Sequence, residues 1–199
     1  MKITIKLLLL LFLVALLSCN SDEKSNKESK SENLESLYLD KGHTISEESF
    51  NALRTELMKA MGQKGIGGAI EFCNIEALPL TDSLSKAFDA TIRRTSLKWR
   101  NPKNKPTDEE RVILEEFESL FKSGTTIKHS IINLSDTEVL YVRPIYAQGL
   151  CQNCHGTPGS TLSPDNHAII KKLYPEDKAT DYQSGDLRGM WSIKFNVNK

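Results

Sequence analysis

The sequence lacks a charge imbalance, a long apolar run and a cysteine count suited to a disulfide framework. Its 199 residues carry 26 Lys and Arg against 26 Asp and Glu, so electrostatics gives no case for a nucleic acid partner. Its longest apolar run, residues 7–17, falls short of the roughly twenty residues that a membrane-spanning helix needs. There are four cysteines, and if Cys19 beside the apolar run carries lipid, the odd count of three that remains argues against a simple disulfide framework.

The first residues have the order of an export signal. Lys2 and Lys6 precede the apolar run, and the small residue Ser18 follows it. The segment LLSC, residues 16–19, resembles the bacterial lipoprotein signal, which implies that Cys19 becomes the lipidated first residue of the mature chain. An ordinary cleaved signal with an incidental cysteine is the alternative. We expect a signal peptide over residues 1–18 and a lipid membrane anchor in the bacterial cell envelope, at the outer membrane or periplasmic face.

The residues after Cys19 are almost free of apolar side chains up to about residue 36. Ser, Lys, Glu and Asn dominate there, and such a composition cannot bury a core. We predict a lipidated disordered tether over residues 19–44 and one globular domain over residues 45–199, with its first apolar residues near Leu37. Without residues 1–18 the chain has 24 basic and 26 acidic residues, so the mature protein is close to neutral.

The periodicity of the domain predicts helices first and strands later. Apolar residues recur at helical spacing in residues 46–64 and 66–78, with Gly65 between the two helices and Pro79 ending the second. Thr107 and Glu110 match a capping box for a third helix, and residues 167–174 form a short fourth one. The expected apolar face of the third helix consists of Val112, Leu114, Phe117, Leu120 and Phe121.

Strand-like runs of β-branched and aromatic residues follow a different period. They cover residues 90–96, 125–134, 138–148 and 185–198, and a short turn joins the second to the third. Helices followed by mainly antiparallel strands predict an α+β fold, an antiparallel sheet with N-terminal helices and further covering helices.

The segment GLCQNCHGTPG, residues 149–159, holds Cys151, Cys154 and His155 within five positions. A thioredoxin-like redox pair would sit in a βαβ pattern, which the antiparallel strands do not provide. A zinc site would need a second pair of Cys or His ligands, and His129 and His167 are isolated from one another. The third interpretation is covalent haem, because C-x-x-C-H is the c-type attachment motif.

The spacing of the motif suits haem attachment. Residues three apart share one face of a helical turn, so the sulfurs of Cys151 and Cys154 can both reach one porphyrin while His155 lies under the iron. With this composition about 0.002 chance matches are expected, so coincidence is a weak explanation. Export also agrees, because c-type haem is attached outside the inner membrane. We expect one covalently attached haem c.

Three longer segments carry a family resemblance: RRTSLKWRNPKNKPTDEE, YVRPIYAQGLCQNCHG and YPEDKATDYQSGDLRGMWSIKF. Together they resemble a family of c-type haem domains with a PAS-like fold, which occur alone or as sensor modules. The likeness runs from about Ser46 to the C-terminus. It implies a single haem, a sheet with helical cover, and a redox or gas-sensing role.

The same resemblance concerns Cys73. Helical spacing alone favours a small buried apolar residue at this position. In the family, the helical motif that matches AIEFCN supplies a cysteine as second axial ligand of the iron, which implies this role for Cys73. The other candidates for that position are Met58, Met61, Met190, His43, His129 and His167.

The expected function is that of a membrane-tethered, non-enzymatic haem sensor of redox state or of a diatomic gas such as CO, NO or O2, signalling to a separate redox or signalling protein. An electron-transfer cytochrome is the first alternative and a peroxidase-like enzyme the second. The haem propionates need cationic donors. The candidates are Arg93, Arg94, Lys98, Arg100, Arg143 and Arg188.

Overall fold

The computed structural model describes residues 21–197, and their side chains from residue 32 on. The chain divides into two compact units between Leu37 and Tyr38. The predicted signal peptide and Cys19 lie outside the described residues. No helix in the described part is long and apolar enough to cross a membrane.

The second unit begins earlier than the boundary predicted at residue 45. Helix α2 spans Ser21–Ile75, so the described residues of the predicted tether are helical. Within this stretch Tyr38 is 8 % exposed and its ring packs against Phe195, with the ring centroids 5.1 Å apart. The polar stretch ends at residue 36, and Tyr38 already packs in the core. Residues 38–44 therefore differ from the polar stretch before them.

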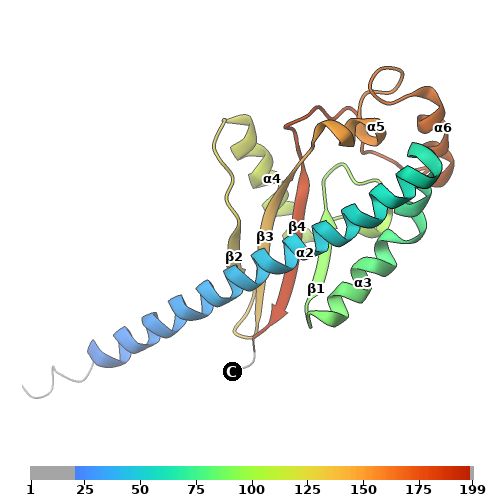
Figure 1. Ribbon diagram of the computed structural model, residues 1–199. Coiled ribbons are helices and arrows are strands. Elements are labelled where there is room, and N and C mark those ends of the chain that lie inside the picture. The colour runs from blue at the N-terminus through green and yellow to red at the C-terminus, as the bar shows by residue number, and fades with distance from the viewer. Residues whose placement is uncertain (1–20, 198–199) are drawn as a thin grey trace, which may run out of the picture. The chain divides into compact units, whose positions relative to one another are not determined.

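The sheet of the second unit has four antiparallel strands. They are β1 (Thr91–Thr95), β2 (Ser130–Asn133), β3 (Glu138–Tyr146) and β4 (Leu187–Asn196). Their spatial order is β1-β4-β3-β2, so the first strand pairs with the last (Figure 1). The α+β class with N-terminal helices and an antiparallel sheet is confirmed.

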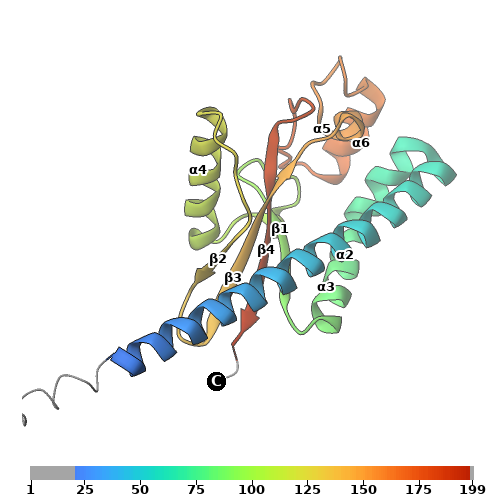
Figure 2. The same ribbon diagram turned by 60° about the vertical axis from the view of Figure 1, so that its left-hand side comes forward.

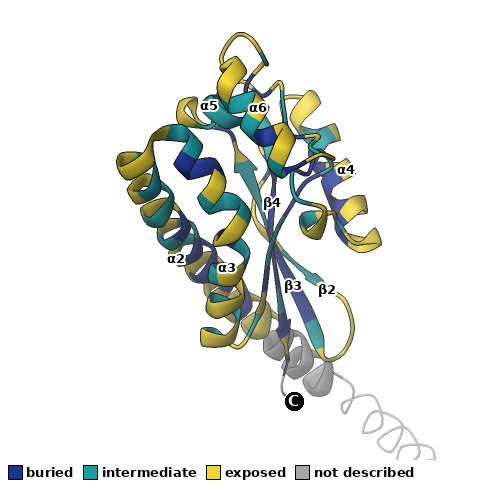
Figure 3. Ribbon diagram, turned by 90° about the vertical axis from the view of Figure 1, so that its right-hand side faces the viewer, coloured by how far each residue is buried: buried dark blue, intermediate teal, exposed yellow. Residues whose placement is uncertain are grey.

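Alternate residues of β3 and β4 face opposite sides of the sheet. Tyr141 and Ile193 pack with Leu53 of α2 and Ala77 of α3 on one side. Leu140, Val142 and Met190 pack on the other side with α4 (Asp108–Lys122). Figure 3 shows the sheet between these two helical layers, with the buried residues of the strands in dark blue.

Helix α2 is interrupted where the glycine was predicted to separate two helices. Gly65 has φ 66° and ψ −165°, outside the helical region. The prediction that Pro79 ends the second helix is wrong, since α2 ends at Ile75 and α3 (Ala77–Ala87) begins before the proline. Proline is tolerated in the first turn of a helix, where the missing N–H would have no helical partner.

The predicted capping box of α4 is present. The Thr107 side chain accepts from the Glu110 amide, and the Glu110 carboxylate accepts from the Thr107 amide. The predicted apolar face needs a correction, because Val112 is 60 % and Phe121 39 % exposed. Ile113 is buried together with Leu114 and Phe117, and Val112 is not. The helix therefore turns residue 113 toward the sheet and residue 112 away from it.

The remaining elements gather around one end of the sheet. They are the 3₁₀ turns η1 (Pro102–Asn104) and η2 (Gly149–Cys151) and the helices α5 (Gln152–His155) and α6 (Pro164–Leu173). Figure 2 shows α5 and α6 where β3 ends and β4 begins, near the last turns of α2. Ile66 and Ile70 of α2 pack there against Leu162 and Ile170.

Candidate functional site

The cysteine motif follows directly from β3 and occupies a helical turn formed by η2 and α5. Cys151 packs against Ala147, Ala179 and Tyr182, and Cys154 packs against the cluster of α2 and α6 that contains Ile70. Both thiols are free and half-buried. Burial raises the pKa of Cys154 to about 11, and the neighbouring Cys73 and Cys151 add to that rise.

The turn closes tightly behind the motif. A Cβ atom on Gly156 would lie 2.1 Å from Thr161 Oγ1 and 2.6 Å from the carbonyl oxygen of Gln152. Only glycine fits this approach without a shift of the neighbouring atoms. The chain therefore turns away from the helix immediately after His155, which leaves the imidazole at the end of α5.

The tautomer of His155 follows from its hydrogen bond. Its Nδ1 lies 2.9 Å from the carbonyl oxygen of Ala179. A carbonyl can only accept, so Nδ1 carries the hydrogen and Nε2 keeps a free lone pair. Burial lowers the pKa of His155 well below its usual value, and the positive charges of Arg188 and Arg100 lower it further. The ring is therefore neutral, with a nitrogen able to bind a metal.

A loop over residues 177–182 wraps around this turn. The amide of Tyr182 donates to the His155 carbonyl over 2.9 Å, and the amide of Asp181 donates to the Gly156 carbonyl over 3.1 Å. The Tyr182 ring stands edge-on to the His155 ring, with the centroids 6.3 Å apart at 90°. None of these loop residues was a candidate from the sequence alone, although they lie in one of the segments that carried the family resemblance.

Arg100 connects the loop to the motif. Its Nη2 donates to the carbonyls of Cys154 (2.6 Å) and Ala179 (3.1 Å). Its guanidinium also forms a bidentate ion pair with Asp177. The Nε atom lies 3.1 Å from Oδ1, and Nη2 lies 3.2 Å from Oδ2. The side chains are 11 % and 0 % exposed, so this pair is shielded from solvent.

Arg94 differs from Arg100 in having no acceptor. Within the part of the chain whose side chains are described, its guanidinium makes no hydrogen bond or ion pair, and it lies 5.7 Å from the centre of the Trp191 ring. Burial lowers the pKa of Arg94, whereas Cys73 and Tyr174 raise it. Arg94 also lines a hollow of about 190 Å³ together with Leu78, Thr81, Asp82, Ile92, Arg93, Lys103 and Asn104.

The other cationic candidates have partners elsewhere or within the loop. Arg93 pairs with Glu110, and Arg143 pairs with Glu47. Lys98 donates to the carbonyl of Thr180. Arg188 donates to the Lys98 carbonyl over 3.1 Å, and its guanidinium lies 5.0 Å from the centre of the Tyr182 ring. The structure thus brings Arg94, Arg100 and Arg188 to the motif and directs Arg93 and Arg143 away from it.

Cys73 lies on the last turns of α2, close enough to the motif to interact electrostatically with Cys154. Burial raises the pKa of the Cys73 thiol, and the charges of Arg94 and Arg100 act in the opposite direction. Asn74, the next residue, donates to the Leu173 carbonyl over 3.4 Å and so ties this turn to α6. The structure therefore places Cys73, Cys154 and His155 around one cluster of arginines.

The other candidate ligands lie in different surroundings. Met190 belongs to the core between the sheet and α4, and Met58 is 43 % exposed on α2. His43 and His129 face each other, with the ring centroids 5.4 Å apart, and His129 also contacts Tyr141. Met61 lies on α2 and His167 on α6, each half-buried. Among residues 21–197, no three or more His, Cys, Asp and Glu side chains form a metal cluster.

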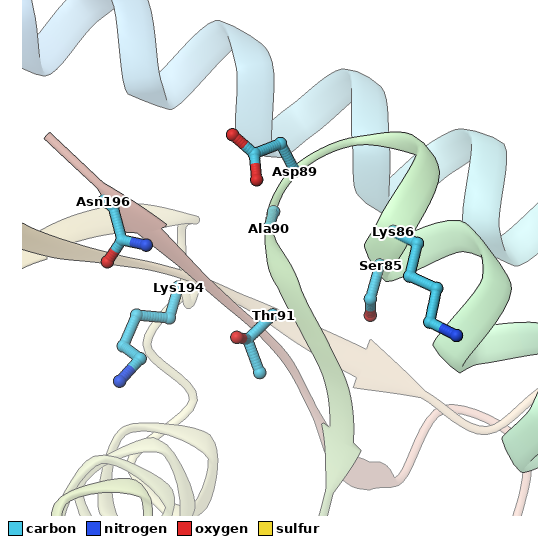
Figure 4. A pocket seen from close by; sticks show the side chains of 7 residues that line it. All are labelled: Ser85, Lys86, Asp89, Ala90, Thr91, Lys194 and Asn196. Atoms are coloured by element: carbon cyan, nitrogen blue, oxygen red, sulfur yellow. The ribbon is translucent and has the colours of Figure 1, made fainter. Parts of the chain in front are cut away.

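A second hollow, of about 300 Å³, lies at the opposite end of the sheet. Figure 4 shows its lining: Ser85, Lys86, Asp89, Ala90, Thr91, Lys194 and Asn196. These side chains come from the end of α3, the connection to β1, and the ends of β1 and β4. None of them belongs to the motif or to the residues around it.

A comparison with known protein families matches the part of the chain that contains the cysteine motif. A family profile described as Tll0287-like matches residues 23–196. The crystal structure of the cyanobacterial heme-protein Tll0287 is similar to this chain with a TM-score of 0.50 and 26 % sequence identity, over 61 % of this chain and 72 % of that one. A search of curated proteins gives no match.

Proposed function

The chain belongs to the Tll0287-like family, and we propose that it binds one haem covalently through Cys151 and Cys154, with His155 as an axial ligand of the iron. The solved relative is a heme-protein, and three features of this chain fit that cofactor. Both thiols are free on one helical turn, the Nε2 of His155 has a free lone pair, and Arg94 is a half-buried cation without an acceptor. When bound, haem supplies an iron that changes oxidation state.

The hydrogen bond from His155 to Ala179 is the observation that carries this proposal. Histidines that bind a metal donate their other ring N–H to a carbonyl, carboxylate or water, which fixes the ring and its tautomer. Here that bond is 2.9 Å long, and the accepting loop is itself bound to the motif at two further backbone positions. This bond occupies Nδ1, so Nε2 is the ring nitrogen that remains able to bind a metal.

We propose Cys73 as the second axial ligand. It shares a cluster with Cys154 and two arginines. Burial raises the pKa of the Cys73 thiol, the two positive charges offset part of that rise, and a bound iron would take the thiolate. A thiolate donor stabilises ferric over ferrous iron, so a low reduction potential is expected. The Cys73→Ala and Cys73→Ser variants should lose the low-spin ferric signal in absorption and electron paramagnetic resonance spectra. An unchanged signal would remove Cys73 from the iron.

We propose that Arg94 and Arg188 donate to the haem propionates. Arg94 is half-buried and has no acceptor among the residues whose side chains are described, so its guanidinium is available to pair with an anion. Arg188 keeps donors beyond its bond to the Lys98 carbonyl. Arg94→Gln and Arg188→Gln should lower the reduction potential, whereas Arg111→Gln, on the exposed surface of α4, should not. Equal potentials in all three variants would contradict the assignment.

The proposed role is that of a sensor of redox state or of a diatomic gas rather than an enzyme. Reduction weakens an iron–thiolate bond, and a freed position can accept CO, NO or O2. Electron transfer is the second candidate, because the exposed Tyr146 and Leu150 flank the motif as an apolar contact for a partner protein. CO binding without peroxide turnover would support sensing. Rapid turnover would support a peroxidase, and refusal of CO with fast electron exchange would support a carrier.

The cofactor is tested by expressing the protein with a cytochrome c maturation system. The oxidised, reduced and CO-treated reduced spectra should show a single haem, and the colour should stay with the chain on a denaturing gel. Loss of colour from the denatured wild-type chain would exclude covalent attachment. The Cys151→Ser/Cys154→Ser double variant is the matched control.

The membrane anchor is a separate proposal about residues outside the structure. The resemblance of residues 16–19 to a lipoprotein signal supports lipidation of Cys19 and a location in the cell envelope. Radiolabelled palmitate should enter the wild-type chain and not the Cys19→Ala variant. Equal labelling of both chains would exclude Cys19 as the lipidated residue.

A further inference from the structure

We propose that Arg100 is a positioning residue for His155 and acts through the carbonyl oxygen of Ala179. The inference rests on the proposed role of His155 as an iron ligand. Both side chains donate to this one oxygen, His155 Nδ1 over 2.9 Å and Arg100 Nη2 over 3.1 Å. The strength of the histidine's hydrogen bond therefore depends on the arginine beside it.

The peptide of Ala179 is held from both sides. Its amide donates to Asp177 Oδ1 over 2.9 Å, and the same carboxylate binds the Arg100 guanidinium with both oxygens. Its carbonyl accepts from Arg100 and His155. Arg100 and Asp177 thus fix the direction of the Ala179 carbonyl, and that direction sets where the imidazole ring points.

Arg100 also holds the ring from the motif side. Its Nη2 donates to the carbonyl of Cys154, the residue directly before His155, over 2.6 Å. One guanidinium therefore binds the backbone that carries the imidazole and the backbone that accepts its N–H. Lysine, with a single compact ammonium group, cannot reproduce this planar set of contacts.

The shared carbonyl predicts a direction for the electronic effect. An oxygen that already accepts from a guanidinium has less electron density to offer a second donor, so Arg100 weakens the His155–Ala179 bond. A weaker bond leaves the imidazole less basic, because outer partners raise the basicity of a ligating histidine. Asp177 still holds the Ala179 amide when Arg100 is removed, so the carbonyl keeps its direction and loses only the competing donor. Removal of Arg100 should therefore strengthen the His155–Ala179 bond and increase electron donation to the iron, which favours the ferric state.

The test uses the haem-loaded full chain with ¹⁵N-labelled histidine. In the CO-bound reduced protein, which is low-spin, Arg100→Gln should move the His155 Nδ1–H resonance downfield. Without CO the same variant should raise the ferric-to-ferrous ratio at a fixed potential by about tenfold. Arg111→Gln also removes one positive charge, but from exposed ion pairs on α4, and should move neither signal. A purely structural role for Arg100 would leave the position of the Nδ1–H resonance unchanged.

Two further outcomes separate the possible failures. Where Arg100→Gln does not fold, Arg100→Lys keeps a positive charge beside Asp177 and should show the same downfield shift. An unmoved resonance in a folded, haem-loaded Arg100 variant overturns the inference and leaves the proposed function intact. A wild-type chain without covalent haem would instead overturn the proposed function itself.

Discussion

At one end of the sheet, where β3 ends at Tyr146 and β4 begins at Leu187, Arg100 forms an ion pair that is shielded from solvent and donates to backbone carbonyls. At the opposite end the ion pair of Lys194 and Glu138 faces solvent. The Arg100–Asp177 pair has side chains 11 % and 0 % exposed, whereas Lys194 and Glu138 are 41 % and 37 % exposed. Both ends carry ion pairs, so residue type alone does not separate them. Burial does, because charges interact strongly only where water is excluded.

The largest difference between the two ends should be in cofactor retention. The double variant Cys151→Ser/Cys154→Ser should lose essentially all covalently bound haem, because the sequence has no other pair of cysteines three residues apart. Lys86→Ala/Lys194→Ala, at the hollow of the opposite end, should keep it. Haem staining after denaturing electrophoresis measures both. Retention of stain by the serine variant would place the attachment site elsewhere in the chain.

The next largest effect should come from the buried ion pair. Asp177→Asn leaves Arg100 without a counter-charge in a shielded site, so we expect unfolding free energy to fall by about 3–5 kcal/mol. Urea denaturation followed by circular dichroism gives the value. A loss below about 1 kcal/mol would mean that water reaches Arg100 and that the two ends are more alike than their burial suggests.

Lowering the pH should destabilise the haem-free chain through a group at the motif end. His155 has a lowered pKa in the folded state, while the unfolded chain titrates near 6.5. Below that pH the unfolded state binds the extra proton, so stability should fall as the pH falls, by at most about 1.4 kcal/mol per pH unit. Denaturation of Cys151→Ser/Cys154→Ser from pH 7.5 to 5 tests this. His155→Gln in that background should flatten the curve, and an equal slope would assign the titration to another group.

The smallest effect should come from the exposed pair. Glu138→Gln removes a contact of 3.0 Å to Lys194, both partly in solvent, and we expect a change of about 0–1 kcal/mol. Urea denaturation in low and high salt measures it, since screening weakens what remains. A loss as large as that of Asp177→Asn would contradict the contrast drawn between the two ends.

Local patterns predicted most of the elements. The four strands and the capping box of Thr107 and Glu110 follow from residue periodicity and from the chemistry of helix ends. Helix α3 was missed, because Pro79 was interpreted as a stop when it lies in the first turn. The exposure of Val112 and Phe121 was also missed, because five apolar residues on one helix do not reveal which of them face the sheet.

The motif could be recognised from the sequence alone, but the residues that surround it in the fold could not. The C-x-x-C-H spacing made Cys151, Cys154 and His155 the candidates for haem attachment from five adjacent positions. The partners of Arg100 lie 54 and 77 residues away from it, at Cys154 and Asp177, and no local pattern joins them. Six cationic side chains were equal candidates until the fold sorted them, because tertiary position determines which cation lacks an acceptor.

The position of β4 in the sequence determines when the sheet can form during synthesis. It is the last strand in sequence and pairs with both β1 and β3, so the sheet cannot close before residue 196 has been synthesised. Residues 151–155 come before that strand in the sequence, so a group can be attached to both sulfurs before the sheet is complete. A group attached at that stage would be present while Asn74 meets Leu173 and Arg100 meets Asp177, across 99 and 77 residues of chain. It would then act as a template around which the final contacts assemble.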